Sequence, residues 1–172
     1  MRLLTDSKPA RPLTGPARLT LLLVLTAMSR VLSVDAADLS SPEGLWAPTD
    51  GDGRPLGLIR IFEWDGAFYG RIEPSSPTEH SSARCTHCTG ARKDQPIVGL
   101  VIMRNLKLKD GEYVGGDILD PRTGWVYGCR FELTDGGRKL RMRGYLGVPL
   151  LGRSQTWVRV DEAATRRGPP AG

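Results

Sequence analysis

The sequence predicts an all-β domain in which about eight antiparallel strands close into an up-and-down barrel. Short runs of alternating apolar and polar residues recur along the chain, and compact Asp/Gly turns separate them. No sustained helical stripe occurs after the first 36 residues. Closure is expected because eight strands left open would expose two unpaired edges. A two-sheet sandwich is the alternative, and it is disfavoured because every visible connection is a hairpin turn.

Residues 1–36 have the pattern of a signal peptide. A basic start ends at Arg18, an apolar core runs from Leu19 to Met28, and the small residues around Ala36 offer a cleavage site. The apolar core is too short to cross a bilayer as a helix, which needs about 20 residues. An uncleaved anchor extending to Val34 is the alternative, but Arg30 would interrupt it. We therefore expect an exported protein that does not span the membrane after cleavage.

The charge balance gives little support to nucleic-acid binding. The whole chain has a formal charge of +5, but residues 1–36 hold five basic and two acidic side chains. The remainder therefore carries a net charge of +2, with basic and acidic residues mixed along it. We predict no nucleic-acid partner.

The barrel domain is expected over residues 44–160, after a short lead-in at 37–43. Asp-Gly pairs at 65–66 and 110–111, and the Asp-Gly-Gly run at 135–137, are strong hairpin signals. The stretch 96–103 is apolar on both faces, so it fits either a buried strand or a short helix. Residues 161–172 are expected to form a disordered tail. The runs that predict strands are 58–63, 67–72, 106–109, 112–118, 125–133 and 140–146.

Alternation assigns an inner face to these strands. In the run 125–133, Trp125, Tyr127, Cys129, Phe131 and Leu133 share one face, and in the next run Leu140, Met142 and Leu146 do so. Eight-stranded barrels are just wide enough to hold one small ligand. The side chains expected to line such a cavity are Phe62, Phe68, Trp125, Tyr127, Phe131 and Met142.

Segment 74–95 is a long polar loop that holds two of the three cysteines. Cys85 and Cys88 are spaced for a local disulfide in an oxidising compartment. A zinc site that adds His80 and His87 is the alternative, but only one Cys-x-x-Cys pair exists. Cys129 is expected to be a buried thiol, with pairing to a loop cysteine as the alternative. No metal and no cofactor is predicted.

No catalytic constellation is visible. Asp117 and Asp120 could form an acidic pair or a calcium loop, but the spacing of Asp120 and Gly124 is typical of a turn in which the aspartate caps backbone N–H groups. Both histidines lie in the long loop, so the strands hold none to act as a base. We therefore expect a protein that is not an enzyme.

A series of motifs resembles one known family. Gly44-Leu-Trp46 opens it, Cys85-Thr-His-Cys88 lies in the middle, and Thr156-Trp157-Val-Arg159 closes it, with other matching runs between them. Over about 42–160 the chain is similar to domain-of-unknown-function family 2147, small exported proteins of Gram-negative bacteria. The resemblance implies a lipocalin-like barrel and a periplasmic or secreted location, and it supplies no catalytic residues.

The opening Gly44-x-Trp46 is also similar to the first signature of lipocalins, in which the tryptophan plugs the closed end of the barrel under an arginine from near the chain end. Arg159 would fill that role here through a cation–π contact worth about 0.5–2 kcal/mol. The contact requires the strand to end at Arg159, because alternation with an inward Val158 and Val160 would otherwise turn the arginine outward.

The leading functional expectation is a cell-envelope protein that binds a small apolar or amphipathic molecule inside its barrel, with the cysteine loop near one mouth. A structural or protein-interaction module without a ligand is the alternative. A metal-assisted enzyme is the weakest candidate. The expectation rests on architecture, and architecture alone does not fix function.

Overall fold

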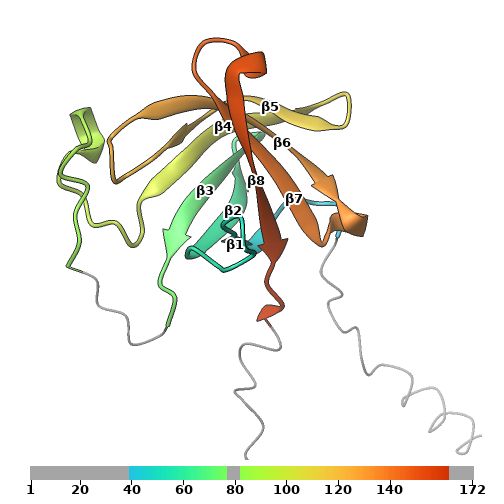
Figure 1. Cartoon of the computed structure of the whole chain (residues 1–172), viewed down its shortest axis with the longest axis horizontal. Coiled ribbons are helices and arrows are strands. Elements are labelled where there is room, and N and C mark those ends of the chain that lie inside the picture. The colour runs from blue at the N-terminus through green and yellow to red at the C-terminus, as the bar shows by residue number, and fades with distance from the viewer. Residues whose placement is uncertain (1–38, 77–81, 163–172) are drawn as a thin grey trace, which may run out of the picture. The chain divides into compact units, whose positions relative to one another are not determined.

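The computed structural model describes residues 39–76 and 82–162, which form a closed barrel of eight antiparallel strands (Figure 1). The predicted signal peptide, His80 and most of the predicted tail lie outside the described residues. The strands are β1 (Gly44–Pro48), β2 (Leu58–Trp64), β3 (Ala67–Glu73), β4 (Val101–Lys109), β5 (Glu112–Leu119), β6 (Val126–Thr134), β7 (Lys139–Tyr145) and β8 (Gly152–Arg159). Three short 3-10 helices are η1 (Gly90–Arg92), η2 (Asp135–Gly137) and η3 (Pro149–Leu151).

Each strand pairs with the next, and β1 closes the barrel by pairing with β8. The predicted barrel is therefore confirmed, and the sandwich alternative is wrong. Up-and-down order places the β2–β3, β4–β5 and β6–β7 turns at one end, together with the start of β1 and the end of β8. We call this the closed end. The opposite end, which we call the mouth, carries the longer loops 49–57, 74–100, 120–125 and 146–151.

The tight turns follow from their residues. Asp65 and Gly66 both have positive φ angles, 51° and 69°, and Asp110 and Gly111 repeat this with 53° and 82°. Two-residue hairpin turns require this conformation at both central positions, and Asp and Gly tolerate it. The Asp-Gly pairs therefore fix where the chain reverses.

The core is built from inward side chains of all eight strands. Completely buried residues include Trp46, Met103, Leu106 and Leu140. Three aromatic rings pack against one another in the interior. Tyr113 stacks on Phe131 with ring centroids 4.5 Å apart, and it makes an edge contact with Phe68 at a centroid distance of 5.1 Å. Such pairs contribute about 0.5–1.5 kcal/mol beyond their buried area.

The ambiguous stretch 96–103 is part lead-in and part strand. Val101–Met103 opens β4, and residues 96–100 precede it. The consecutive residues Ile102 and Met103 are both buried, although neighbours on a strand face opposite ways. The pairing of β4 with β3 shifts in register between Val101 and Met103, so the alternation is interrupted at Ile102.

Three side chains depart from the predicted inner face. Phe62 follows the inward Ile61, so it lies on the outer wall, where it stacks on Tyr69 with centroids 5.9 Å apart. Trp125 precedes β6 and is 56% exposed, and Leu146 follows the last residue of β7 and is 49% exposed. The predictions that Trp125 and Leu146 face inward are wrong, because both residues lie just outside the strands whose alternation was used to place them.

Candidate ligand-binding site

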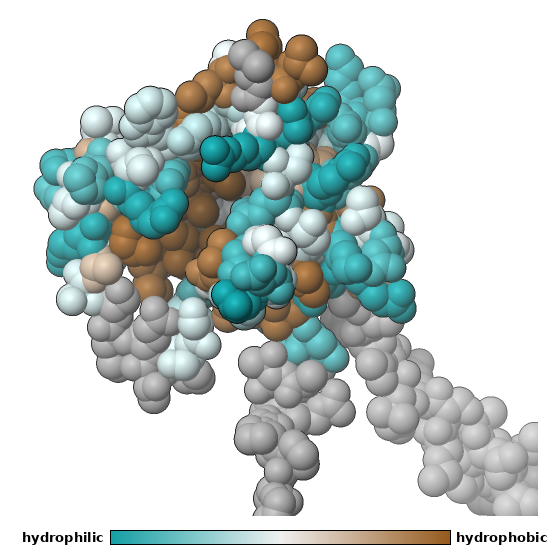
Figure 2. Space-filling model, in the orientation of Figure 1, coloured by the Kyte–Doolittle hydropathy of each residue, from teal (hydrophilic) through white to brown (hydrophobic). Residues whose placement is uncertain are grey.

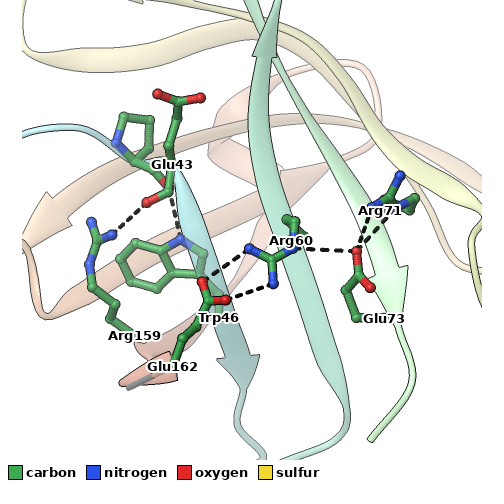
Figure 3. Close-up of polar contacts among 8 residues, drawn as sticks. Glu43, Trp46, Arg60, Arg71, Glu73, Arg159 and Glu162 are labelled. Atoms are coloured by element: carbon green, nitrogen blue, oxygen red, sulfur yellow. Dashed lines mark hydrogen bonds and ion pairs between the residues drawn. The ribbon is translucent and has the colours of Figure 1, made fainter. Parts of the chain in front are cut away.

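The closed end is sealed by Trp46 and Arg159, as the opening Gly-x-Trp predicts. The Arg159 Cζ atom lies 4.3 Å from the centroid of the Trp46 ring, and the two residues are paired between β1 and β8. The expected inward Val158 is wrong, because it is 39% exposed whereas Trp157 is 2% exposed. Alternation along β8 therefore places Arg159 on the inner face with Trp157, over the Trp46 ring. The indole Nε1 donates a hydrogen bond of 2.8 Å to the carbonyl oxygen of Pro42 (Figure 3).

The Arg159 guanidinium also ties together chain segments that lie outside the strands. It donates hydrogen bonds to the carbonyl oxygens of Gly137, Glu43 and Ser41, at 2.8, 2.6 and 2.6 Å. Gly137 belongs to η2, while Ser41 and Glu43 precede β1. This one side chain therefore joins the start of the barrel to the β6–β7 turn.

The inward side chains of β5 and β6 are more accessible at the mouth than in the middle of the barrel. Leu140, Phe131 and Trp157 are fully or almost fully buried, whereas the inward residues Ile118 and Tyr127 near the mouth are only partly buried. Inward apolar side chains that other protein atoms do not fully cover offer apolar surface that a ligand can contact. Figure 2 shows a recess lined by apolar atoms among hydrophilic side chains on the face in view.

Gly144 on β7 lies beside these two residues. A Cβ atom added there would meet only the Tyr127 Cβ at 3.8 Å and the Ile118 Cγ2 at 3.9 Å, which are ordinary contacts. The position can therefore accept a side chain that points into the interior. It marks the place where added volume would compete with a ligand.

The cysteine loop lies against the barrel at the mouth. Cys85 and Cys88 form a disulfide, as the sequence predicts, and both are buried in the same apolar cluster as Leu100 and Leu119. The loop is closed by a backbone hydrogen bond from Cys85 N to Gln95 O of 2.9 Å. The zinc alternative fails for these two cysteines because their sulfurs are bonded to each other.

The β5–β6 turn, residues 120–125, packs against this loop. Asp120 accepts hydrogen bonds from the backbone N–H of Arg122 at 3.0 Å through its side chain and from Gly124 N at 2.8 Å through its carbonyl oxygen. Burial, the largest single influence, raises the pKa of Asp120, but the Arg122 side chain, the Arg122 backbone N–H and the Thr123 hydroxyl together lower it by more, so the pKa lies below its usual value. Asp120 therefore acts as a turn residue, as predicted.

Gly124 is the point of contact between the turn and the loop. Its φ angle is +75°, and an added Cβ would lie 1.9 Å from the His87 carbonyl oxygen. The Cys85 Sγ atom lies 3.5 Å from the carbonyl oxygen of Pro121 in the same turn. The two mouth segments are thus packed backbone against backbone.

A charged contact holds the loop from the other side. Arg92 in η1 lies 3.9 Å from the Asp117 carboxylate, which also pairs with Arg104 at 3.3 Å. Burial, followed by the positive charge of Arg104, lowers the pKa of Arg92, and Asp117 opposes this shift. Asp117 therefore pairs with Arg104 and lies at ion-pair distance from the buried Arg92 Nη1, which has no hydrogen-bond partner among the described residues, and Asp120 is occupied in its own turn.

A surface pocket of about 370 Å³ lies between the cysteine loop and the β5–β6 turn. Its lining combines apolar and cationic groups. Arg84, His87 and Arg122 supply the charged or titratable groups, and Ala83, Ile97 and Pro121 supply apolar surface. Ile97 also packs against the core cluster, so this pocket adjoins the apolar interior.

The predicted lining residues separate into three groups. Phe131 and Met142 are buried inside the barrel, and Phe68 and Tyr127 are inward and partly buried. Phe62 and Trp125 do not line the interior. Ile118, Arg92 and Arg104 were missed. The alternation of Ile118 with Gly116 is a signal that could have revealed it, whereas the two arginines required the β4–β5 register.

Cys129 is a free, fully buried thiol on β6, so pairing with a loop cysteine is excluded. Burial, with a smaller contribution from the negative charge of Asp117, raises its pKa from 9.0 to about 12. The unfolded chain loses this proton near pH 9 and the folded chain only near pH 12, so stability falls as the pH rises between these values.

We expect the free energy of unfolding, measured by urea titration, to decrease by up to about 1.4 kcal/mol for each pH unit above 9 through this thiol. Cys129→Ala is the matched control, since it removes the titrating group. Equal pH slopes for the two proteins would contradict the assignment.

Among residues 39–76 and 82–162, no group of three or more His, Cys, Asp or Glu side chains is arranged to hold a metal ion. In the same residues, no helix has the length and apolar character needed to cross a membrane. The arrangement that remains is an apolar interior with one sealed end and one looser end.

Comparison with protein families matches residues 44–159 to a model described as an uncharacterized protein conserved in bacteria, DUF2147. The chain belongs to the DUF2147 family. This match spans all eight strands of the barrel, from the first residue of β1 to the last of β8.

Among solved structures, the DUF2147 barrel is similar to protein HP1028 from Helicobacter pylori, which is described as belonging to the lipocalin family. The TM-score is 0.63 at 18% sequence identity, with 74% of this chain and 88% of that chain covered. At this identity the similarity concerns the fold, which is lipocalin-like. No curated protein matches the chain significantly.

Proposed function

We propose that this protein binds a small apolar or amphipathic molecule in its barrel, with entry through the mouth, after export to the cell envelope. The observation that carries the proposal is the partial exposure of inward apolar side chains of β5 and β6 at the mouth. Trp46 seals the closed end completely, whereas Ile118 and Tyr127 remain partly exposed at the other. Inward apolar side chains that solvent reaches at one end of the barrel suit contact with an apolar ligand.

The build of the mouth supports the proposal. The disulfide, the Gly124–His87 contact and the Arg92–Asp117 pair hold the loops in one position. A site whose walls are held in place before binding loses less freedom when the ligand arrives. The disulfide also fits an oxidising compartment, which supports the export part of the proposal.

Gly144→Leu tests the proposal, because its side chain would enter the interior between Tyr127 and Ile118. We expect the apolar fluorescent probe N-phenyl-1-naphthylamine to bind the natural protein in a saturable manner, and the variant to bind at least about tenfold more weakly, as expected when a ligand-sized space is filled. Fluorescence titration measures both values.

Lys139→Leu is the matched control, since it adds an apolar side chain to the exposed outer face of the same strand. It should leave probe binding unchanged. Absence of saturable binding in the natural protein, or an equal loss in both variants, would contradict a ligand site inside the barrel. Native mass spectrometry of protein purified from the envelope would then identify the ligand that the cell supplies.

A further inference from the structure

The β7–β8 loop, residues 146–151, presents apolar side chains to solvent. Leu146, Val148 and Leu150 are 49%, 55% and 85% exposed. In Figure 2 apolar atoms gather at the top of the molecule, where Figure 1 places this loop. The segment contains no charged residue. Three large apolar side chains exposed together in one short loop call for a partner surface.

Hydrogen bonds from Arg143 hold the backbone of this loop in the conformation that exposes its apolar side chains. The Arg143 guanidinium, from the outer face of β7, donates hydrogen bonds to the carbonyl oxygens of Pro149 at 2.7 Å and Leu150 at 3.0 Å. It also donates to the Ser154 hydroxyl at 3.2 Å. One arginine therefore holds two carbonyl oxygens of the loop, while the Leu150 side chain remains 85% exposed.

The neighbouring mouth loop has matching chemistry. β6 is paired with β7, so the β5–β6 turn and the β7–β8 loop leave the barrel from adjacent strands. The turn carries Trp125, 56% exposed, and Arg122, whose side chain is 87% exposed. Arg153 at the start of β8 is exposed as well. Tryptophan and arginine beside exposed aliphatic residues are typical of segments that sit at a membrane–water interface.

A bilayer fits this surface better than a folded protein does. A specific protein interface needs about 800 Å² on each partner, with a continuous packed core. A six-residue loop with one neighbouring turn falls short of the roughly 20–30 residues that each side of such an interface contributes. Insertion into the headgroup region of a bilayer requires only a few apolar side chains, with cations nearby to meet anionic lipids.

We propose that the β5–β6 and β7–β8 loops dock on the surface of a bilayer that contains anionic phospholipid. Leu146, Val148 and Leu150 enter the interface, Trp125 lies at headgroup level, and Arg153 faces the lipid phosphates. This docking goes beyond the proposed ligand binding and does not require it. It would place the mouth of the barrel at the membrane surface.

Sedimentation with vesicles tests the docking. Vesicles of phosphatidylglycerol and phosphatidylethanolamine should retain the full-length natural protein, and pure phosphatidylcholine vesicles should retain much less. The double variant Val148→Ser/Leu150→Ser should lower the partition constant by about tenfold or more, because two inserted side chains are lost. Arg153→Glu should weaken binding to the anionic vesicles only.

Leu108→Ser is the matched control, because Leu108 is 60% exposed on β4 near the closed end. Its vesicle binding should equal that of the natural protein. The docking is overturned if the natural protein does not sediment with anionic vesicles, or if Leu108→Ser loses as much binding as the loop variant. It is also overturned if the loop variant changes only the oligomeric state in gel filtration, which would identify a second copy as the partner.

N-phenyl-1-naphthylamine titration of the same proteins separates this proposal from the proposed function. Loop variants that lose vesicle binding should still bind the probe. Loss of vesicle binding by Gly144→Leu together with intact loops would contradict independent docking.

Discussion

Trp46→Ala is expected to lower the free energy of unfolding by about 3–5 kcal/mol, the range for removing a fully buried tryptophan. The side chain has no exposed surface, and its Nε1 donates to the Pro42 carbonyl oxygen. Its loss would leave a cavity beneath Arg159 and leave that carbonyl oxygen without its donor. Urea denaturation followed by circular dichroism measures the change.

Trp64→Ala is the matched control for this experiment. Trp64 lies at the end of β2 and is largely exposed, so its removal should change stability by less than about 1 kcal/mol. A double-mutant cycle with Arg159→Met would isolate the cation–π contact, which should contribute about 0.5–2 kcal/mol. Equal losses for Trp46→Ala and Trp64→Ala would contradict the role of Trp46 as the plug.

Gly124→Ala is expected to destabilise the protein by at least about 2 kcal/mol, because two costs combine. The φ angle of +75° is unfavourable for alanine, and the new Cβ would lie 1.9 Å from the His87 carbonyl oxygen. The cysteine loop would have to move away from the β5–β6 turn. Thermal unfolding measures the stability, and hydrogen exchange of residues 84–97 should report faster opening of the loop.

Gly136→Ala separates the two costs. Gly136 has a similar φ angle of +60°, but no atom would lie within 4 Å of an added Cβ. It should therefore lose only the conformational part, about 1 kcal/mol. If Gly124→Ala is no worse than Gly136→Ala, the contact between the loop and the turn does not contribute to stability.

Local signals predicted most of the fold. The Asp-Gly turns placed the closed-end reversals correctly, since a positive φ at two successive residues leaves the chain few alternatives. Gly44-x-Trp46 with Arg159 predicted the sealed end. The stretch 96–103 could not be assigned, because only its last three residues are strand and a register shift interrupts their alternation.

The mouth was harder to predict for physical reasons. Trp125 and Leu146 continue the period of β6 and β7, and nothing local shows that the strands end just before or after them. Phe62 has the composition of a core residue, but only the inward position of Ile61 shows that it belongs to the outer wall. The Arg92–Asp117 pair joins residues whose proximity depends on the path of the cysteine loop.

The pairing of β1 with β8 has a consequence for how the protein is made. The first strand has no second neighbour until the last one emerges, so a nascent chain that stops at β7 leaves both β1 and β7 with open hydrogen-bonding groups. The barrel can therefore be completed only after synthesis of the whole domain has ended. Until then the unpaired edges of β1 and β7 can pair with strands of another chain.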